Sequence, residues 1–142
     1  MAELVGEHAY QMDPKGRISL PAKFREAFED GVFLTLGQEG CVYVFPREEW
    51  EQRTAEAKSL PISGERSRAY TRMFFSSADI ATLDTQGRLV IPRTLRENAR
   101  LSREVTVVGV SERLEIWDRE QWERYSEAYR GSYISGELVP ER

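Results

Sequence analysis

The alternation of apolar and polar positions predicts short β-strands in two similar series along the chain. The first series lies at residues 8–12, 18–20, 32–36 and 41–45. The second lies at residues 79–83, 89–91, 105–108 and 113–117. Within each series the last two strands are close enough to form a hairpin.

Helical spacing of apolar residues follows each predicted hairpin. One helix begins at Pro46 and places Trp50, Thr54 and Ala57 on one face. Another covers residues 64–76. A third follows residue 118, where an aspartate with a glutamine three positions later is typical of a capping box. Gly131 is expected to end this last helix, and residues 132–142 to form a mobile tail.

The same unit occurs twice in the chain. Residues 12–28 align without gaps on residues 83–99, and six of the 17 positions are identical. These pairs are Asp13/Asp84, Gly16/Gly87, Arg17/Arg88, Pro21/Pro92, Arg25/Arg96 and Glu26/Glu97. After one inserted residue, the match resumes from position 37 against 109 to position 50 against 122. Self-similarity of this extent indicates an internal duplication.

Each repeat reads as a strand, a glycine-containing turn, a short strand, a short helix and a hairpin. Pro21 and Pro92 suit the first position of the short helix, and Gly31 suits the end of the first one. One repeat is too small to enclose a core, so the two are expected to close into one pseudo-twofold barrel. We therefore predict a mainly β protein with helices (α+β), a single domain over residues 1–142. Its parts are repeat 1 (5–50), connecting helices (51–76), repeat 2 (77–122) and a helix end with tail (123–142).

Composition removes several classes of function. With 40% hydrophobic and 31% charged residues, the 142-residue chain is typical of a soluble globular protein. No apolar run is long enough to span a membrane and no secretory signal is apparent, so a cytoplasmic protein is expected. Cys41 is the only cysteine and His8 the only histidine, and both are expected to be structural. No metal site, no cofactor, no small-molecule substrate and no enzymatic activity are expected.

Charge is segregated along the chain. The net charge of −4 argues against nucleic-acid binding when taken globally. However, acidic residues gather at 48–56 and 115–127, whereas residues 13–25 carry Lys15, Arg17, Lys23 and Arg25 against Asp13 alone. A local basic segment is what binds phosphate.

The repeated turns resemble those of the AbrB-like superfamily. The motif Asp-x-x-Gly-Arg occurs at 13–17 and at 84–88, followed each time by proline four residues later and then by Arg-Glu. Two such copies in tandem, with helices after each hairpin, are similar to the MraZ family over residues 3–130. The resemblance implies a swapped-hairpin, double-psi-like barrel and a transcriptional regulator of the division and cell-wall gene cluster. It also implies a nucleoid-associated ring, an octamer or larger, that binds direct repeats in promoter DNA.

The resemblance assigns the contact with double-stranded DNA to the two turns. It implies roles for Asp13, Lys15 and Arg17 in the first turn, and for Asp84 and Arg88 in the second. An arginine on a tight turn can donate to two acceptors on guanine or on phosphates, and an aspartate four residues earlier can orient it.

Further polar residues near the turns complete the candidate site. Lys15, Lys23 and Arg25 are expected to contact phosphates, with Arg96 at the equivalent position of the second repeat. Gln86 stands where the first turn has lysine and could read adenine, so the two turns need not contribute equally.

Structural interpretations stay open beside the functional one. Each Asp–Arg pair could be an exposed ion pair that stabilises its turn. Arg25 and Arg96 could pair with Glu29 and Glu97. The aromatic residues of the acidic helices are expected in a core or interface rather than stacked on bases; they are Trp50, Trp122, Tyr125 and Tyr129. The alternative function is an antitoxin-like module that binds a protein partner.

Overall fold

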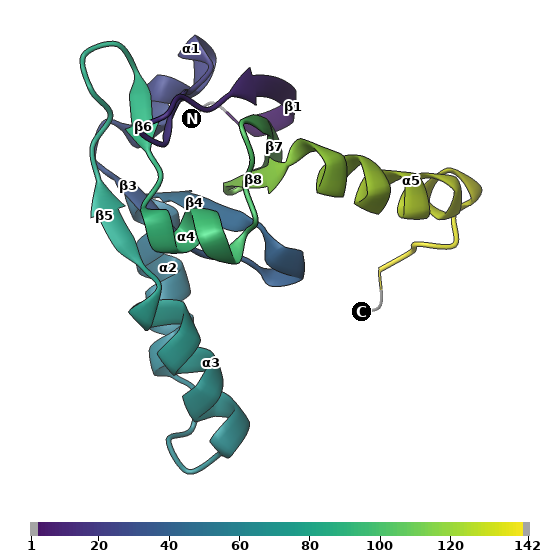
Figure 1. Ribbon diagram of the computed structural model, residues 1–142. Helices are drawn as coiled ribbons and strands as arrows, with labels where there is room; N and C mark the ends of the chain where they lie inside the picture. The colour runs from purple at the N-terminus through teal and green to yellow at the C-terminus, as the bar shows by residue number, and fades with distance from the viewer. Residues whose placement is uncertain (1–2, 141–142) are drawn as a thin grey trace.

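The computed structural model describes residues 3–140, and these form a six-stranded antiparallel sheet, a two-stranded ribbon and five α-helices (Figure 1). The six-stranded sheet has the order β1-β7-β8-β4-β3-β5, and the ribbon pairs β2 with β6. The strands are β1 (Leu4–Gln11), β2 (Arg17–Ser19), β3 (Val32–Leu36), β4 (Val42–Pro46), β5 (Asp79–Ala81), β6 (Arg88–Val90), β7 (Glu104–Ser111) and β8 (Leu114–Asp118). The helices are α1 (Ala22–Arg25), α2 (Arg47–Lys58), α3 (Glu65–Ser76), α4 (Arg93–Asn98) and α5 (Arg119–Ser135).

The leading strand of each repeat pairs with the hairpin of the other repeat. Strand β1 of repeat 1 lies antiparallel to β7 of repeat 2, from Leu4 opposite Ser111 to Gln11 opposite Glu104. Strand β5 of repeat 2 pairs in the same way with β3 of repeat 1. The two hairpins join through β4 and β8. The predicted α+β class and its exchange of hairpins between two repeats are confirmed.

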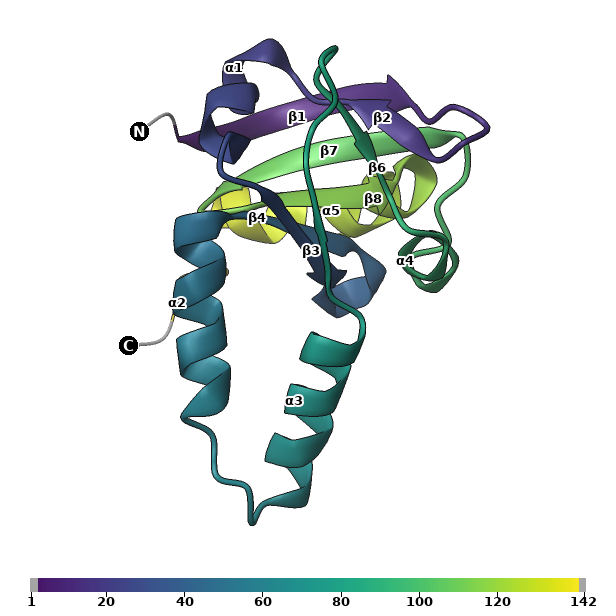
Figure 2. The same cartoon turned by 90° about the vertical axis from the view of Figure 1, so that its left-hand side faces the viewer.

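The core lies between the six-stranded sheet and the β2–β6 ribbon, which crosses one of its faces (Figure 2). Equivalent positions of the two repeats fill it with fully buried side chains. The pairs are Ile18 with Leu89, Leu20 with Ile91, Phe24 with Leu95, and Phe28 with Ala99. Burial of each large apolar side chain contributes about 1.5–3 kcal/mol, so neither repeat holds the fold by itself.

Two helical extensions project from this barrel in different directions (Figure 1). The first is a hairpin of α2 and α3, in which Trp50 stacks between Phe33 of the sheet and Phe74, with ring centroids 5.5 and 5.2 Å apart. The second is α5, whose Trp122 packs against Trp117 at 5.3 Å. The placement of these tryptophans in packed clusters is confirmed.

Several predicted boundaries were wrong. Helix α5 continues through Gly131 to Ser135 and ends at Gly136, which takes the left-handed backbone conformation (φ 85°). The predicted tail therefore begins as helix, and its last residues, 141–142, lie outside the described part of the chain. The prolines precede the short helices as caps instead of occupying their first position.

The predicted cap of α5 and the structural placement of Cys41 and His8 are confirmed. The Asp118 side chain accepts a hydrogen bond from the backbone N–H of Gln121 at 3.3 Å, as the capping pattern predicts. Cys41 is fully buried and has a free thiol, and His8 lies on β1 with its ring edge against Phe24. No helix within residues 3–140 combines the length and the apolar character needed to cross a membrane.

Candidate nucleic-acid interface

The first Asp-x-x-Gly-Arg turn is held together by the carboxylate of Asp13. Its Oδ1 accepts hydrogen bonds from the backbone N–H groups of Lys15 and Arg17, both at 2.9 Å. Its Oδ2 accepts one from Nε of the Arg17 side chain at 2.6 Å. Gly16 closes the turn with φ 79°, a conformation that glycine adopts without strain. We call this segment, residues 13–17, turn 1.

Turn 2, residues 84–88, repeats this arrangement nearly atom for atom. Asp84 accepts backbone hydrogen bonds from Gln86 and Arg88 at 2.9 Å and a side-chain bond from Nε of Arg88 at 2.7 Å. In both turns the aspartate uses only Nε of the arginine. Within residues 3–140 the terminal Nη atoms of Arg17 and Arg88 have no hydrogen-bond partner. The ion pair thus leaves both terminal nitrogens of each guanidinium available to a ligand.

Hydrogen bonding keeps both aspartates ionised. The backbone N–H of Arg17 is the main cause that lowers the pKa of Asp13 below its usual value. The backbone N–H of Arg88 does the same to the pKa of Asp84. Because the acceptors are full carboxylates, the bonds that orient the two arginines are of the stronger, charge-assisted kind.

Arg25 and Arg96 lie across the pseudo-twofold axis, each over the turn of the other repeat. The guanidinium of Arg96 covers Gly16, where an added Cβ would come within 2.6 Å of its Nη1. The guanidinium of Arg25 covers Gly87 in the same way, and its Nε donates to the carbonyl of Leu20 at 3.3 Å.

The ion pairs considered for these two arginines do not form within the described residues. Glu97 pairs with Arg93 at 2.9 Å instead, and no ion pair joins Arg25 to Glu29. Two backbone hydrogen bonds, from Leu20 to Gly87 and from Ile91 to Gly16, tie the turns together further. Each turn is therefore supported by residues of the opposite repeat.

The other candidate residues are placed unequally. Lys15 and Gln86 are exposed within turns 1 and 2. Lys23 lies near Gly6 with its Nζ 5.1 Å from the ring centre of Phe24. Gly6 is five residues from the end of β1 that leads into turn 1, which is about 16 Å along an extended strand. The structure does not bring Lys23 to the turn, and its contact with phosphate stays a prediction.

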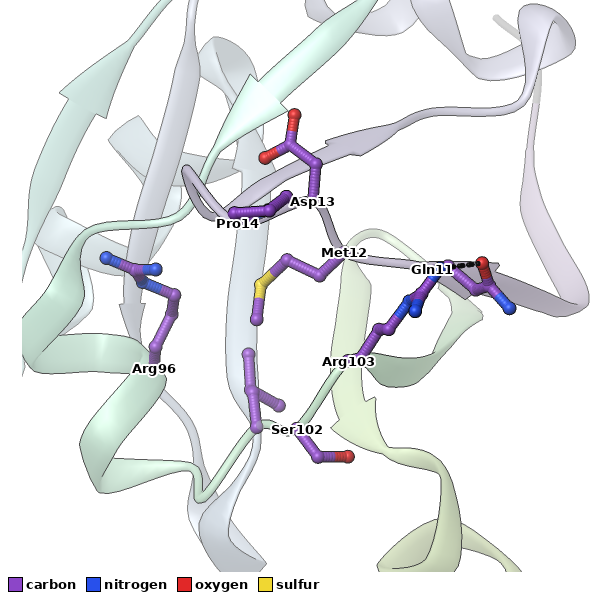
Figure 3. A pocket seen from close by; sticks show the side chains of 8 residues that line it. Gln11, Met12, Asp13, Pro14, Arg96, Ser102 and Arg103 are labelled. Carbon is purple, nitrogen blue, oxygen red and sulfur yellow. Dashed lines mark hydrogen bonds between the residues drawn. The ribbon is translucent and has the colours of Figure 1, made fainter.

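Arg103, beside turn 1, was not predicted from the sequence as a residue of the site. Arg103 precedes β7 and donates from Nη2 to Oε1 of Gln11 at 3.1 Å (Figure 3). It lines, with Arg96, a cleft next to Asp13 and Pro14. No motif marks position 103, but the density of arginines between positions 88 and 103 is a signal that could have drawn attention to it.

Comparison with known proteins agrees with this duplicated architecture. A family described as "MraZ protein, putative antitoxin-like" matches the chain twice, over residues 4–73 and 74–135. A protein of Pelotomaculum thermopropionicum called transcriptional regulator MraZ is 46% identical over 129 residues, 91% of this chain and 89% of its own length. A protein of the same name from Frankia casuarinae is 42% identical over 138 residues, 96% of each chain.

A third relative, transcriptional regulator MraZ of Heliobacterium modesticaldum, is 41% identical over 91% of this chain and 90% of its own length. The matches cover both repeats, both turns and the helical extensions. This chain belongs to the MraZ family.

Proposed function

We propose that this protein is a transcriptional regulator that binds double-stranded DNA through turns 1 and 2. One observation carries the proposal: in both turns an aspartate fixes the arginine through Nε and leaves its Nη atoms free. A guanidinium held in this way can donate to N7 and O6 of guanine or to phosphate oxygens. Because its orientation is set before binding, less conformational entropy is lost in the complex.

The residues around the two arginines would have different roles in DNA binding. Lys15 beside Arg17 adds a positive charge for the DNA backbone. Gln86 beside Arg88 can make a bidentate contact with adenine, which would give turn 2 a larger share of sequence reading. Asp13 and Asp84 would act as positioning residues, since their oxygens are occupied within the turns.

Exposed apolar side chains support assembly of several subunits. One group lies at the end of the α2–α3 hairpin and includes Leu60 and Ile62, which are 36% and 84% exposed. Another lies at the end of α5 and includes Tyr133 and Ile134, which are 74% and 76% exposed. Two different surfaces at separate ends of a subunit suit head-to-tail contacts, which close into a ring when the rotation allows.

A ring would explain how a subunit with few cations binds tightly. Successive subunits would present the same turns at regular intervals along the duplex, and the first contact would raise the effective concentration of the next. Direct repeats are the DNA arrangement that matches such an array. The resemblance to the family supports promoter DNA of the division and cell-wall gene cluster as the target, in the cytoplasm and on the nucleoid.

Fluorescence anisotropy with a duplex from the region upstream of the chain's own gene tests this function. The wild type should bind this duplex more tightly than a scrambled one of equal length. The double variant Arg17→Ala/Arg88→Ala should lose binding, whereas Arg124→Ala/Arg130→Ala, which removes the same charge from exposed sites of α5, should retain it. Light scattering checks that all three proteins have the same mass. Equal binding by the two double variants would contradict the proposal.

A protein-interaction module is the second candidate, because exposed apolar residues on α5 would also suit a protein partner. The description of the matching family as antitoxin-like favours the same candidate. Absence of DNA binding by the wild type at low salt would support this candidate over the first.

A further inference from the structure

Two clefts of equivalent construction flank the turns, each built from the turn of one repeat and the short helix of the other. Cleft 1 beside turn 1 encloses about 560 Å³, and cleft 2 beside turn 2 about 300 Å³. Cleft 1 is lined by Gln11, Met12, Asp13, Pro14, Arg96, Leu101, Ser102 and Arg103. Cleft 2 is lined by Arg25, Glu26, Phe28, Glu29, Thr82, Leu83, Asp84, Thr85 and Gly87.

The charges of the two clefts are opposite. Cleft 1 carries two arginines, Arg96 and Arg103, and its single carboxylate belongs to Asp13, which is already paired with Arg17. Cleft 2 carries one arginine and, besides the paired Asp84, two further carboxylates from Glu26 and Glu29. The pseudo-twofold axis thus relates a cleft that attracts anions to one that repels them.

The hydrogen bonds of the two equivalent arginines also differ. In cleft 2, Nε of Arg25 donates to the carbonyl of Leu20. In cleft 1, Nε of Arg96 is buried and has no hydrogen-bond partner within residues 3–140. An unpaired buried donor is unfavourable, and within the described residues the guanidinium of Arg96 lacks the protein acceptor that Arg25 has.

Cleft 1 places its donors around a small apolar floor. In Figure 3, Arg96 and Arg103 stand on opposite sides of the Met12 side chain, and Ser102 lies below it. Gln11 accepts a hydrogen bond from Nη2 of Arg103, which steadies that side chain and leaves its other N–H groups available. Two guanidinium groups that line one cleft are suited to a tetrahedral oxyanion, because each can donate to two oxygens.

We propose that cleft 1 binds a phosphate group between Arg96 and Arg103, and that cleft 2 does not. The ligand is a phosphate ester, either a phosphodiester of the DNA backbone next to turn 1 or a small phosphorylated compound. This assignment is independent of whether the turns read DNA, since it depends only on the donors and charge of the cleft.

Titration with inorganic phosphate, followed by NMR at constant ionic strength with chloride as the balancing anion, tests the site directly. The wild type should show saturable shifts of the Arg96 side-chain N–H and of the backbone amides of Gly16 and Arg103. The variant Arg103→Gln, whose side chain is exposed, should weaken phosphate binding at least tenfold without a change in fold. Arg96→Gln should do the same and Arg96→Lys should restore part of the affinity. Arg25→Gln in cleft 2 is the matched control and should bind like the wild type.

A second measurement distinguishes the two sources of phosphate. If the DNA backbone supplies it, the double variant Arg96→Gln/Arg103→Gln should reduce the slope of log K against log[salt] by about 0.9 for each lost contact. If a small phosphorylated compound supplies it, the salt dependence of DNA binding should stay unchanged while inorganic phosphate still saturates the cleft. A wild type that binds no DNA would count against the proposed function only, since the phosphate titration would still decide the site.

The inference fails if phosphate produces no saturable shift in the wild type. It also fails if Arg25→Gln weakens phosphate binding as much as Arg103→Gln does.

Discussion

Turn 1 and turn 2 should contribute differently to DNA binding, although their internal geometry is the same. The perturbations are the single variants Arg17→Ala and Arg88→Ala. Each removes one guanidinium but leaves both backbone hydrogen bonds to the aspartate, at 2.9 Å, so each turn should keep its shape. Loss of one bidentate contact costs about 1–3 kcal/mol, or roughly 5- to 150-fold in affinity on cognate DNA.

The surroundings of the turns set the difference between the two variants. Apart from the paired aspartates, cleft 1 has a charge of +2 from its two arginines, and cleft 2 has −1 from one arginine and two glutamates. At roughly 10 Å in water, each charge contributes about 0.4 kcal/mol towards a phosphate. Three charge units therefore favour turn 1 by about 1 kcal/mol at low salt, and by about a third of that at 0.1 M salt.

The assay measures the affinity of both variants for cognate and scrambled duplexes at two salt concentrations. Arg17→Ala should weaken both duplexes, with the larger effect at low salt. Arg88→Ala should mainly reduce the preference for the cognate duplex, because Gln86 lies beside it. Equal losses from the two variants on both duplexes would show that the turns are interchangeable and that the charge of the clefts has no influence.

Three further predictions concern stability. Gly109→Ala should lower the free energy of unfolding by about 1–3 kcal/mol in chemical denaturation, because its Cβ would lie 2.5 Å from backbone atoms of β1. Gly131→Ala, in open space on α5, should raise the free energy of unfolding by up to about 1 kcal/mol, and a change of the same sign in both variants would contradict this reasoning. Phe24→Ala should cost about 3–5 kcal/mol, since the ring is 1% exposed in the shared core. The stabilising effect of Asp13 on turn 1 should be complete above pH 3.8, its usual pKa, and should be lost as the pH falls through the lower pKa of the folded state. Amide hydrogen exchange at Gly16 across this pH range measures the effect, and protection of Gly16 that persists below the folded-state pKa would refute the prediction.

The sequence predicted the duplicated unit, the order of its elements and the composition of the turns, because these depend on local patterns. It predicted the first strand only from residue 8, whereas β1 begins at Leu4. The additional residues are strand because they pair with β7, more than ninety positions away, and no local window contains that information. Gly131 was expected to end a helix that continues past it, since the modest cost of one helical glycine is smaller than the gain from the turns on either side.

The least predictable part of the site is the packing between repeats. Arg25 and Arg96 were expected on short helices, in contact with phosphate or paired with Glu29 and Glu97. The sequence did not indicate that each covers the turn glycine of the other repeat. The opposite charges of the two clefts depend on the same packing, because Arg103 and Glu29 approach the turns only in the folded barrel.

This crossed packing has a consequence for how the protein can evolve. In a barrel made from two identical single-repeat chains, symmetry would force both turns and both clefts to change together. Fusion of the repeats into one chain removes that constraint, but it does not make each repeat an independent unit of inheritance. Turn 1 and helix α4 share one cleft although they are about eighty residues apart in the gene. Substitutions in one repeat should therefore be compensated by substitutions in the other. A segment transferred between relatives should retain its function only if it carries both the turn and the helix that packs on it.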